Sequence, residues 1–193
     1  EQIVFTIPGT PWTGTNGVDL FQGGSGSDTA YALDANDSLV GNGGNDVLYG
    51  GNGIDRLYGG TGNDTLDGGT DAANNTLYGG SGNDTGYGSS GNDVMNGEMG
   101  DDVLYGNAGN DILRGDELNG VYVGNDTIFG GAGSDFIDGK LGNDTIQGDD
   151  NIDTLYGNAG LDIIAGGTGN DIIFGDADND IIGGDDNDDF VFG

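Results

Sequence analysis

The chain has 193 residues and a formal net charge of −31, from 34 acidic side chains against only Arg56, Arg114 and Lys140, and it contains 45 glycines. Such a field of carboxylates repels nucleic acid and anionic lipid and attracts cations, so no nucleic-acid partner is expected. A chain of this composition buries too little apolar surface to offset its conformational entropy unless something else holds it together.

Cysteine and histidine are both absent. Disulfides and thiolate metal sites are therefore excluded, and so are the commonest transition-metal ligand and the commonest general base. No apolar run reaches the length of a membrane span, so no membrane insertion is expected. The opening EQIVFTIPGTPW lacks the basic start and long apolar stretch of a signal peptide. A cytosolic chain, a mature processed chain and a fragment all remain open.

Residues 1–13 differ from everything that follows. They hold both prolines and the only tryptophan, Trp12, and the stretch QIVFTI alternates as a strand does. We expect an N-terminal strand or cap segment that covers one end of the array beginning at residue 14. The alternative is a strand donated to the end of a neighbouring molecule.

From Gly14 to Phe192 the sequence repeats a nine-residue unit, G-G-x-G-x-D-x-U-x, in which U is a large apolar residue. Nineteen units fit, and 17 of them have nine residues. The sixth position is Asp in 18 units and Asn75 in the other, while the apolar eighth position weakens at Ala30 and lapses at Gly86. Random low complexity does not keep two chemically opposite positions in one register, so the period predicts a folded array over 14–193 rather than a disordered linker.

Two units are longer than nine residues. One carries about two extra residues near 71–72, and the other carries about six near 116–121. We expect a tolerated surface bulge at the second insertion, with a binding loop as the minority alternative. Metal sites beside Asn75 and beside the loop at 115–123 are expected to be weakened or absent.

Each unit divides into a turn and a strand. The first six residues are turn-formers, with glycine where φ must be positive, and the last three, such as VLY at 47–49, have strand composition. Alternation along the strand directs the eighth residue to one face and the seventh and ninth to the other. Two units then make one coil of 18 residues. We expect an all-β solenoid of nine or ten coils, roughly 45 Å long, with a thin core of one apolar residue per half-coil.

The turns supply the chemistry that the thin core lacks. Calcium prefers six to eight oxygen ligands from carboxylates and backbone carbonyls, and a glycine-rich turn lets several carbonyls point at one place. Stacking sets the carboxylates of units i and i+2 one coil apart, so a cation between them would join the coils and remove their repulsion. Nineteen units in two columns allow up to 17 such ions, whose charge would offset that of the chain. Metal binding would then contribute folding free energy.

This repeat resembles the nonapeptide of the RTX (repeats-in-toxin) family, and the resemblance covers almost the whole chain. It implies a right-handed parallel β-roll with Ca²⁺ in the turns on both sides, and export from the cell, commonly by a type I route. It implies a ligand role for the sixth-position aspartates, which are Asp19, Asp28, Asp37, Asp46, Asp55, Asp64, Asp84, Asp93, Asp102, Asp111, Asp126, Asp135, Asp144, Asp153, Asp162, Asp171, Asp180 and Asp189. The chain departs from the pattern at Asn75, and the fourth-position glycine is replaced at Ala35, Asn151, Asp178 and Asn187.

No catalytic motif accompanies the repeats. The chain has no zinc-protease motif, nucleophile elbow or phosphate-binding loop, and every Asp recurs as a ligand would, so no enzymatic activity is expected. We expect a calcium-dependent structural β-roll of a secreted or cell-surface protein, folding on extracellular calcium. A regular carbohydrate- or ice-binding face is less favoured because the outward threonines are irregularly spaced.

The outward positions near the C-terminus suggest a covered surface. Ninth-position aromatics fall on both expected sheets, and the seventh position becomes apolar late in the chain. The last repeat, DDFVFG, lies within the rhythm and has no polar cap, so either more protein follows or another molecule covers it. The alternative function is thus a subunit that assembles with copies of itself, end to end or laterally, into a filament or surface layer. The assembly candidates are Trp12, Ile172, Phe174, Phe190 and Phe192.

Overall fold

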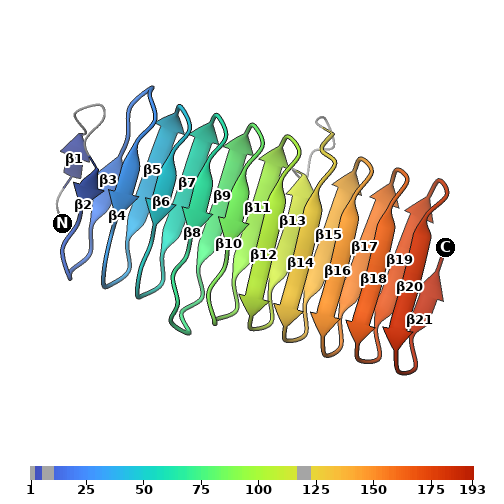
Figure 1. Cartoon of the computed structure of the whole chain (residues 1–193). Helices are drawn as coiled ribbons and strands as arrows, with labels where there is room; N and C mark the ends of the chain where they lie inside the picture. The colour runs from blue at the N-terminus through green and yellow to red at the C-terminus, as the bar shows by residue number, and fades with distance from the viewer. Residues whose placement is uncertain (1–2, 6–10, 117–122) are drawn as a thin grey trace.

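The computed structural model describes residues 3–5, 11–116 and 123–193. Figure 1 shows a long stack of short strands that advances coil by coil from the N-terminus to the C-terminus. The described residues form strands and turns without a helix. Accordingly, this part of the chain has no helix long and apolar enough to cross a membrane.

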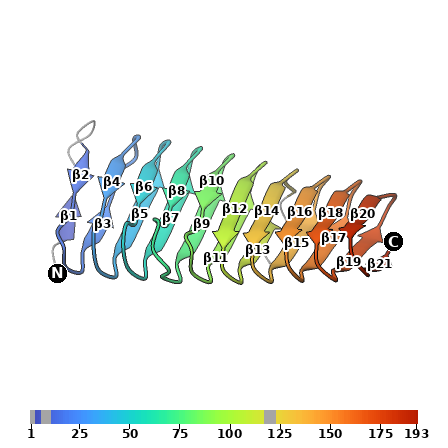
Figure 2. The ribbon, with the colours of Figure 1, turned by 60° about the horizontal axis from the view of Figure 1, so that its bottom comes forward.

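Odd-numbered and even-numbered strands form two separate parallel sheets, which Figure 2 shows as two layers. The odd sheet has 11 strands. In order they are β1 (Ile3–Phe5), β3 (Leu20–Gln22), β5 (Ser38–Gly43), β7 (Arg56–Thr61), β9 (Thr76–Ser81), β11 (Val94–Met99), β13 (Ile112–Asp116), β15 (Phe136–Leu141), β17 (Thr154–Ala159), β19 (Ile172–Ala177) and β21 (Phe190–Phe192).

The even sheet has 10 strands. In order they are β2 (Trp12–Thr13), β4 (Thr29–Tyr31), β6 (Val47–Tyr49), β8 (Thr65–Asp67), β10 (Thr85–Tyr87), β12 (Val103–Ala108), β14 (Thr127–Ala132), β16 (Thr145–Asp150), β18 (Ile163–Thr168) and β20 (Ile181–Asp186). Each strand pairs with the strand two further along the chain, so two units make one coil and the predicted all-β solenoid is confirmed.

Register keeps every position of the repeat in a column. Leu39 of β5 pairs with Leu57 of β7, and Leu48 of β6 pairs with Leu66 of β8. The insertion near 71–72 does not change the strand register, because Leu57 still pairs with Leu77 across it. The two extra residues of this unit therefore do not disturb the ladder.

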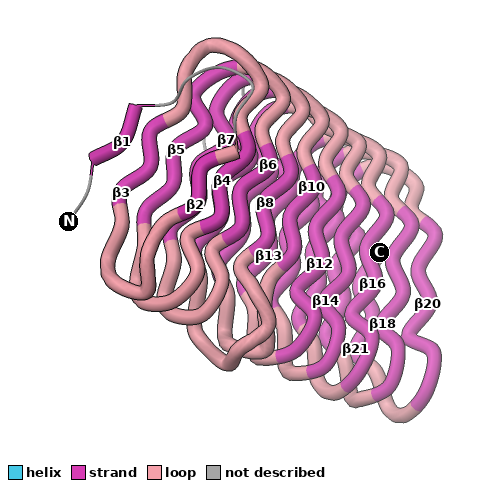
Figure 3. Tube along the Cα trace, turned by 60° about the vertical axis from the view of Figure 1, so that its left-hand side comes forward, coloured by secondary structure: helices cyan, strands magenta, loops and turns pink. Residues whose placement is uncertain are grey.

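Many strands are longer than the three residues expected from composition. Strands such as β7 and β12 span six residues, because the second and third residues of the next unit also pair with the neighbouring coil. The ladder even reaches the fourth residue, where the Gly44 amide donates to the Thr61 carbonyl at 2.8 Å. Stacked turns thus extend the sheets, and the turns gather along the two edges seen in Figure 3.

The core is a double file of eighth-position side chains, as predicted. Those from Phe21 to Ile173 are buried, apart from the gap that Gly86 leaves in the file. The Met95 side chain fills this gap, since a Cβ added at Gly86 would lie 2.6 Å from the Met95 methyl group. Val191, in the last strand, is 47% exposed because no further coil covers it.

The N-terminal segment adds one strand to each sheet. β1 pairs in parallel with β3, and β2 pairs with β4. The Trp12 ring is buried and packs 5.1 Å from the Phe21 ring, so it lies over the first coil of the core. This placement fits a cap, and the division at residue 13 stays a prediction.

Candidate metal centres in the stacked turns

The turns form two rows, one leading into the odd-numbered strands (the odd row) and one leading into the even-numbered strands (the even row). In 14 units both the second and fourth residues have positive φ, as in Gly131 at 102° and Gly133 at 141°. We call such a turn open. The geometry persists where glycine is replaced, with Ala35 at 90° and Asn151 at 79°, because the stacked neighbours impose it.

From Asp37 onward, each sixth-position side chain links two coils through one oxygen. Its Oδ1 accepts a hydrogen bond from the backbone N–H of the sixth-position residue one coil earlier, at 2.6–3.0 Å. Asp144, for example, accepts from Asp126 at 2.8 Å. Seventeen such bonds occur, one for every pair of stacked turns, and they join each row into a continuous column.

The other carboxylate oxygen has no protein partner in most turns. Oδ2 is buried and accepts no hydrogen bond in 13 of the sixth-position aspartates: Asp37, Asp46, Asp55, Asp64, Asp84, Asp102, Asp111, Asp126, Asp135, Asp144, Asp153, Asp162 and Asp171. A buried charged oxygen without a partner is strongly destabilising, so a cation is the expected complement. Asp180 and Asp189, in the last two units, are only half-buried.

Burial changes the acidity of these groups. It raises the pKa of Asp102 to about 9 and the pKa of Asp111, Asp126 and Asp153 to about 8, with repulsion from neighbouring aspartates adding to the rise. The backbone hydrogen bond to each carboxylate acts in the opposite direction. Strongly perturbed carboxyl groups in a fixed column are suited to binding a metal, whose charge favours the ionised form.

Backbone oxygens crowd beside the unpartnered carboxylate oxygen. A Cβ added at Gly130 would lie 2.5 Å from Asp135 Oδ2 and 2.6 Å from the carbonyl oxygen of Gly148, which belongs to the next coil. The same holds at Gly79, beside Asp84 and the Gly97 carbonyl. A Cβ at either glycine would collide with these oxygens. In the described residues no three acidic side chains converge on one point, so an ion would take backbone carbonyls as further ligands, as calcium does.

Three sixth-position aspartates differ, because a backbone amide of their own turn donates to Oδ2. Asp19 Oδ2 accepts from the Thr15 amide at 2.6 Å, and Asp28 Oδ2 accepts from the Gly24 amide at 2.7 Å. Asp93 Oδ2 accepts from the Ser89 amide at 2.5 Å. No periodicity argument distinguishes these three from the others, and Ser89 carried no sequence signal apart from its place one coil after Asn75.

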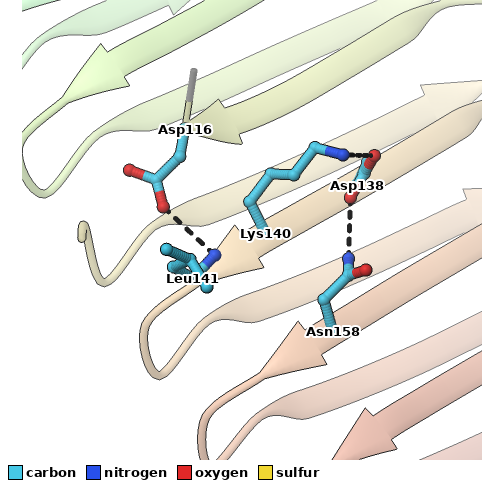
Figure 4. A network of polar contacts seen from close by, with 5 residues as sticks. All are labelled: Asp116, Asp138, Lys140, Leu141 and Asn158. Atoms are coloured by element: carbon cyan, nitrogen blue, oxygen red, sulfur yellow. Dashed lines mark hydrogen bonds and ion pairs between the residues drawn. The ribbon is translucent and has the colours of Figure 1, made fainter. Parts of the chain in front are cut away.

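The longer insertion is tied down by Asp116, which is fully buried. Its Oδ1 accepts from the Gly124 amide and its Oδ2 from the Leu141 amide, both at 3.1 Å. Beside it, Lys140 pairs with Asp138, which also accepts from the Asn158 side-chain amide at 2.7 Å (Figure 4). Residues 117–122 of the predicted loop lie outside the described residues. At its end Asp126 keeps a buried, unpartnered Oδ2, as in the regular turns.

The five assembly candidates lie in two places. Trp12 is buried, whereas Phe190 is 64% exposed and Phe192 is 52% exposed on the last strand. Phe174 stacks on Phe192 with the ring centroids 4.9 Å apart, and Ile172 pairs with Phe190 in register. Their role in assembly stays a prediction.

These features define a parallel β-roll whose turns bring carboxylate and carbonyl oxygens together. The family of the RTX calcium-binding nonapeptide repeat (4 copies) matches the chain in nine stretches, at residues 13–48, 40–72, 49–86, 70–95, 87–121, 123–146, 139–170, 147–182 and 156–191. The chain therefore belongs to this family of calcium-binding repeats, which confirms the resemblance. No match is found among curated proteins.

Proposed function

We propose that the chain is a non-enzymatic structural β-roll of a secreted or cell-surface protein, exported by a type I route and folded by extracellular Ca²⁺. The observation that carries this proposal is the set of 13 buried aspartate Oδ2 atoms without a partner. Thirteen buried carboxylates would oppose folding of the metal-free chain at neutral pH. Calcium in the turns would reverse this effect and contribute the free energy that the thin core cannot supply.

Low calcium would keep the chain unfolded inside a cell, and millimolar calcium outside would fold it. We expect circular dichroism to show a largely unfolded chain in excess chelator and a β spectrum after addition of millimolar Ca²⁺. Magnesium should substitute poorly, because it requires tighter octahedral geometry. A β spectrum that chelation leaves unchanged at neutral pH would refute the proposal.

A second function rests on the C-terminal end of the roll. There β21 pairs only with β19, and the core-position residue Val191 is exposed beside Phe190 and Phe192. We infer that a second copy of the chain covers this coil, so that calcium-loaded rolls join end to end or pack laterally. The mass of the particle with and without calcium tests it: particles larger than one chain, formed only in calcium, support assembly.

A further inference from the structure

One step of the odd row is built differently from the rest. A step here means the space between two successive turns of one row. The step between the turns at 68–75 and 88–93 contains Asn75, which is 1% exposed, and Ser89, which is 4% exposed. Neither residue supplies the unpartnered carboxylate oxygen that marks the regular steps.

Asn75 preserves the hydrogen-bonded column but not the free oxygen. Its Oδ1 accepts from the Asp55 amide at 2.8 Å, as an aspartate would. Its Nδ2, in place of an oxygen, donates to the Ser89 hydroxyl at 3.2 Å and lies within 3.5 Å of the Gly68 and Ala73 carbonyl oxygens. An N–H group directed at these oxygens repels a cation from the same position.

The Ser89 hydroxyl joins the two turns where an ion would otherwise do so. It lies 2.8 Å from the Ala73 carbonyl oxygen of one turn and 3.2 Å from Asp93 Oδ2 of the other. The Ser89 hydroxyl also accepts hydrogen bonds from the Asn75 side-chain amide and from the Gly91 backbone amide, both at 3.2 Å. The side-chain polar atoms of Asn75, Ser89 and Asp93 are therefore all hydrogen-bonded within the protein.

The backbone of the turn at 88–93 agrees with this description. Ser89 and Gly91 do not have the positive φ of an open turn, and the Ser89 amide points inward to cap Asp93 Oδ2. The first two units have the same closed form. There the Thr15 amide donates to Asp19 Oδ2, and the Gly24 amide donates to Asp28 Oδ2. The turn at 88–93 is the closed turn that lies in the interior of the array.

The neighbouring steps keep their oxygens. Asp71, in the insertion, directs Oδ2 to the Gly53 amide of the preceding coil at 2.9 Å, and its Oδ1 is buried without a partner. In the next turn of the row, Asp111 Oδ2 is also buried and unpartnered, beside the Gly130 carbonyl oxygen of the following coil. In the even row, on the opposite edge of the roll, Asp84 and Asp102 each keep a buried Oδ2 without a partner. The exception is therefore confined to the turns at 68–75 and 88–93.

We propose that the step between the turns at 68–75 and 88–93 is a calcium-free joint, held by the Asn75, Ser89 and Asp93 network, and that Asp93 is not a calcium ligand. The inference rests on the proposed calcium-binding function. It lowers the ceiling from 17 ions to 16 and divides the odd row into two blocks, while the even row stays continuous.

Anomalous diffraction from calcium in crystals of the whole chain tests the joint directly, because it locates each ion along the two rows. We expect calcium peaks along both rows with a gap at this step. A peak in the gap would overturn the joint and leave the proposed function intact. A roll without calcium peaks that also stays folded in chelator would overturn the proposed function itself.

Two matched variants give a second readout in solution, by equilibrium dialysis of calcium. Asp93→Asn and Asp111→Asn change neighbouring positions of one row, and both keep the Oδ1 acceptor of the column. We expect Asp111→Asn to bind one calcium fewer than the unmodified chain and Asp93→Asn to bind the same number. Equal losses in both variants would contradict the joint. If Asp93→Asn does not fold, the diffraction result on the unmodified chain decides.

Discussion

At the scale of single residues, the two carboxylate oxygens of a sixth-position aspartate have different surroundings. Oδ1 accepts a backbone N–H from the preceding coil, whereas Oδ2 faces carbonyl oxygens and has no partner, as at Asp135. Asparagine can do the first but not the second, which is what Asn75 shows. The constancy of Asp in the repeat is therefore explained by the second oxygen, since hydrogen bonding alone would accept either residue.

The raised pKa values predict how pH acts on the metal-free chain. Burial holds the pKa of Asp102 at about 9 and that of Asp153 at about 8 in the roll, against 3.8 for an ordinary aspartate. The roll therefore binds more protons than the unfolded chain, so its stability is greatest below the unfolded pKa and is lost as pH rises through the raised pKa values, from about 6 at Asp46 to about 9 at Asp102. In calcium-depleted buffer we expect more β signal by circular dichroism near pH 5 than near pH 8.5.

Calcium should reverse this dependence, because the ion binds only the ionised carboxylates and must displace their protons. Calcium titrations at the two pH values provide the check, with tighter binding expected at the higher pH. Calcium affinity that falls as pH rises would contradict carboxylate ligation in the turns.

The turn holds Ala35 in a left-handed backbone conformation, with φ at 90°. A left-handed conformation costs an L-residue about 1–2 kcal/mol, while glycine adopts it freely at some entropic cost. We expect Ala35→Gly to stabilise the calcium-loaded roll by roughly 0.5–1 kcal/mol in denaturant unfolding. Ala108→Gly is the control, since Ala108 lies in β12 without a positive φ, and it should destabilise. Destabilisation by both changes would show that the turn tolerates alanine without strain.

At the scale of the strand, a period of two assigns opposite roles to adjacent residues. Leu104 of β12 is 3% exposed in the core, while its neighbour Tyr105 points outward and stacks on Tyr87 and Phe129 at 5.1 Å. Similar near-parallel stacks run along both outer faces, with centroids 4.8–5.2 Å apart. That spacing is close to the strand separation, so one outward aromatic per coil stacks without adjustment.

This alternation predicts that truncating Leu104 and truncating its neighbour Tyr105 lower the stability of the roll by different amounts. Leu104→Ala should destabilise the calcium-loaded roll by about 2–5 kcal/mol, because it leaves a cavity in a core one residue wide. Tyr105→Ala should cost about 0.5–1.5 kcal/mol, the value of a surface aromatic pair. Denaturant unfolding measures both. A larger effect at Tyr105 would mean that the outward face is covered in solution.

At the scale of the whole molecule, the two ends of the roll are unlike. Trp12 and β2 lie over the first coil, whereas Phe190, Val191 and Phe192 stand exposed on the last. A contact between unlike ends repeats indefinitely unless it closes into a ring, so head-to-tail joining produces filaments. Under the proposed function, calcium would first form both ends, and only then could they meet.

Assembly is therefore expected to depend on calcium and on the last strand. Phe190→Asp should abolish larger particles in light scattering, while Ile112→Asp should not, since Ile112 occupies the equivalent outward position in the middle of the odd sheet. Deleting residues 1–13 should likewise leave a roll that folds without extending. A calcium-loaded chain that stays monomeric at high micromolar concentration would refute assembly and leave residues 1–13 as a simple cap.

The amino-acid sequence alone determined the period, the inward eighth position, the two parallel sheets and the column of aspartates. A strict repeat places equivalent residues in equivalent environments, so local reasoning about one unit holds for all. The tertiary structure decided what depends on contacts between coils. Turn residues join the ladder beside β7, and Met95 fills the space above Gly86. It also decided that the Ser89 hydroxyl closes one step, because that hydroxyl meets Asn75 and Ala73 only after a full coil of chain has folded back onto the row.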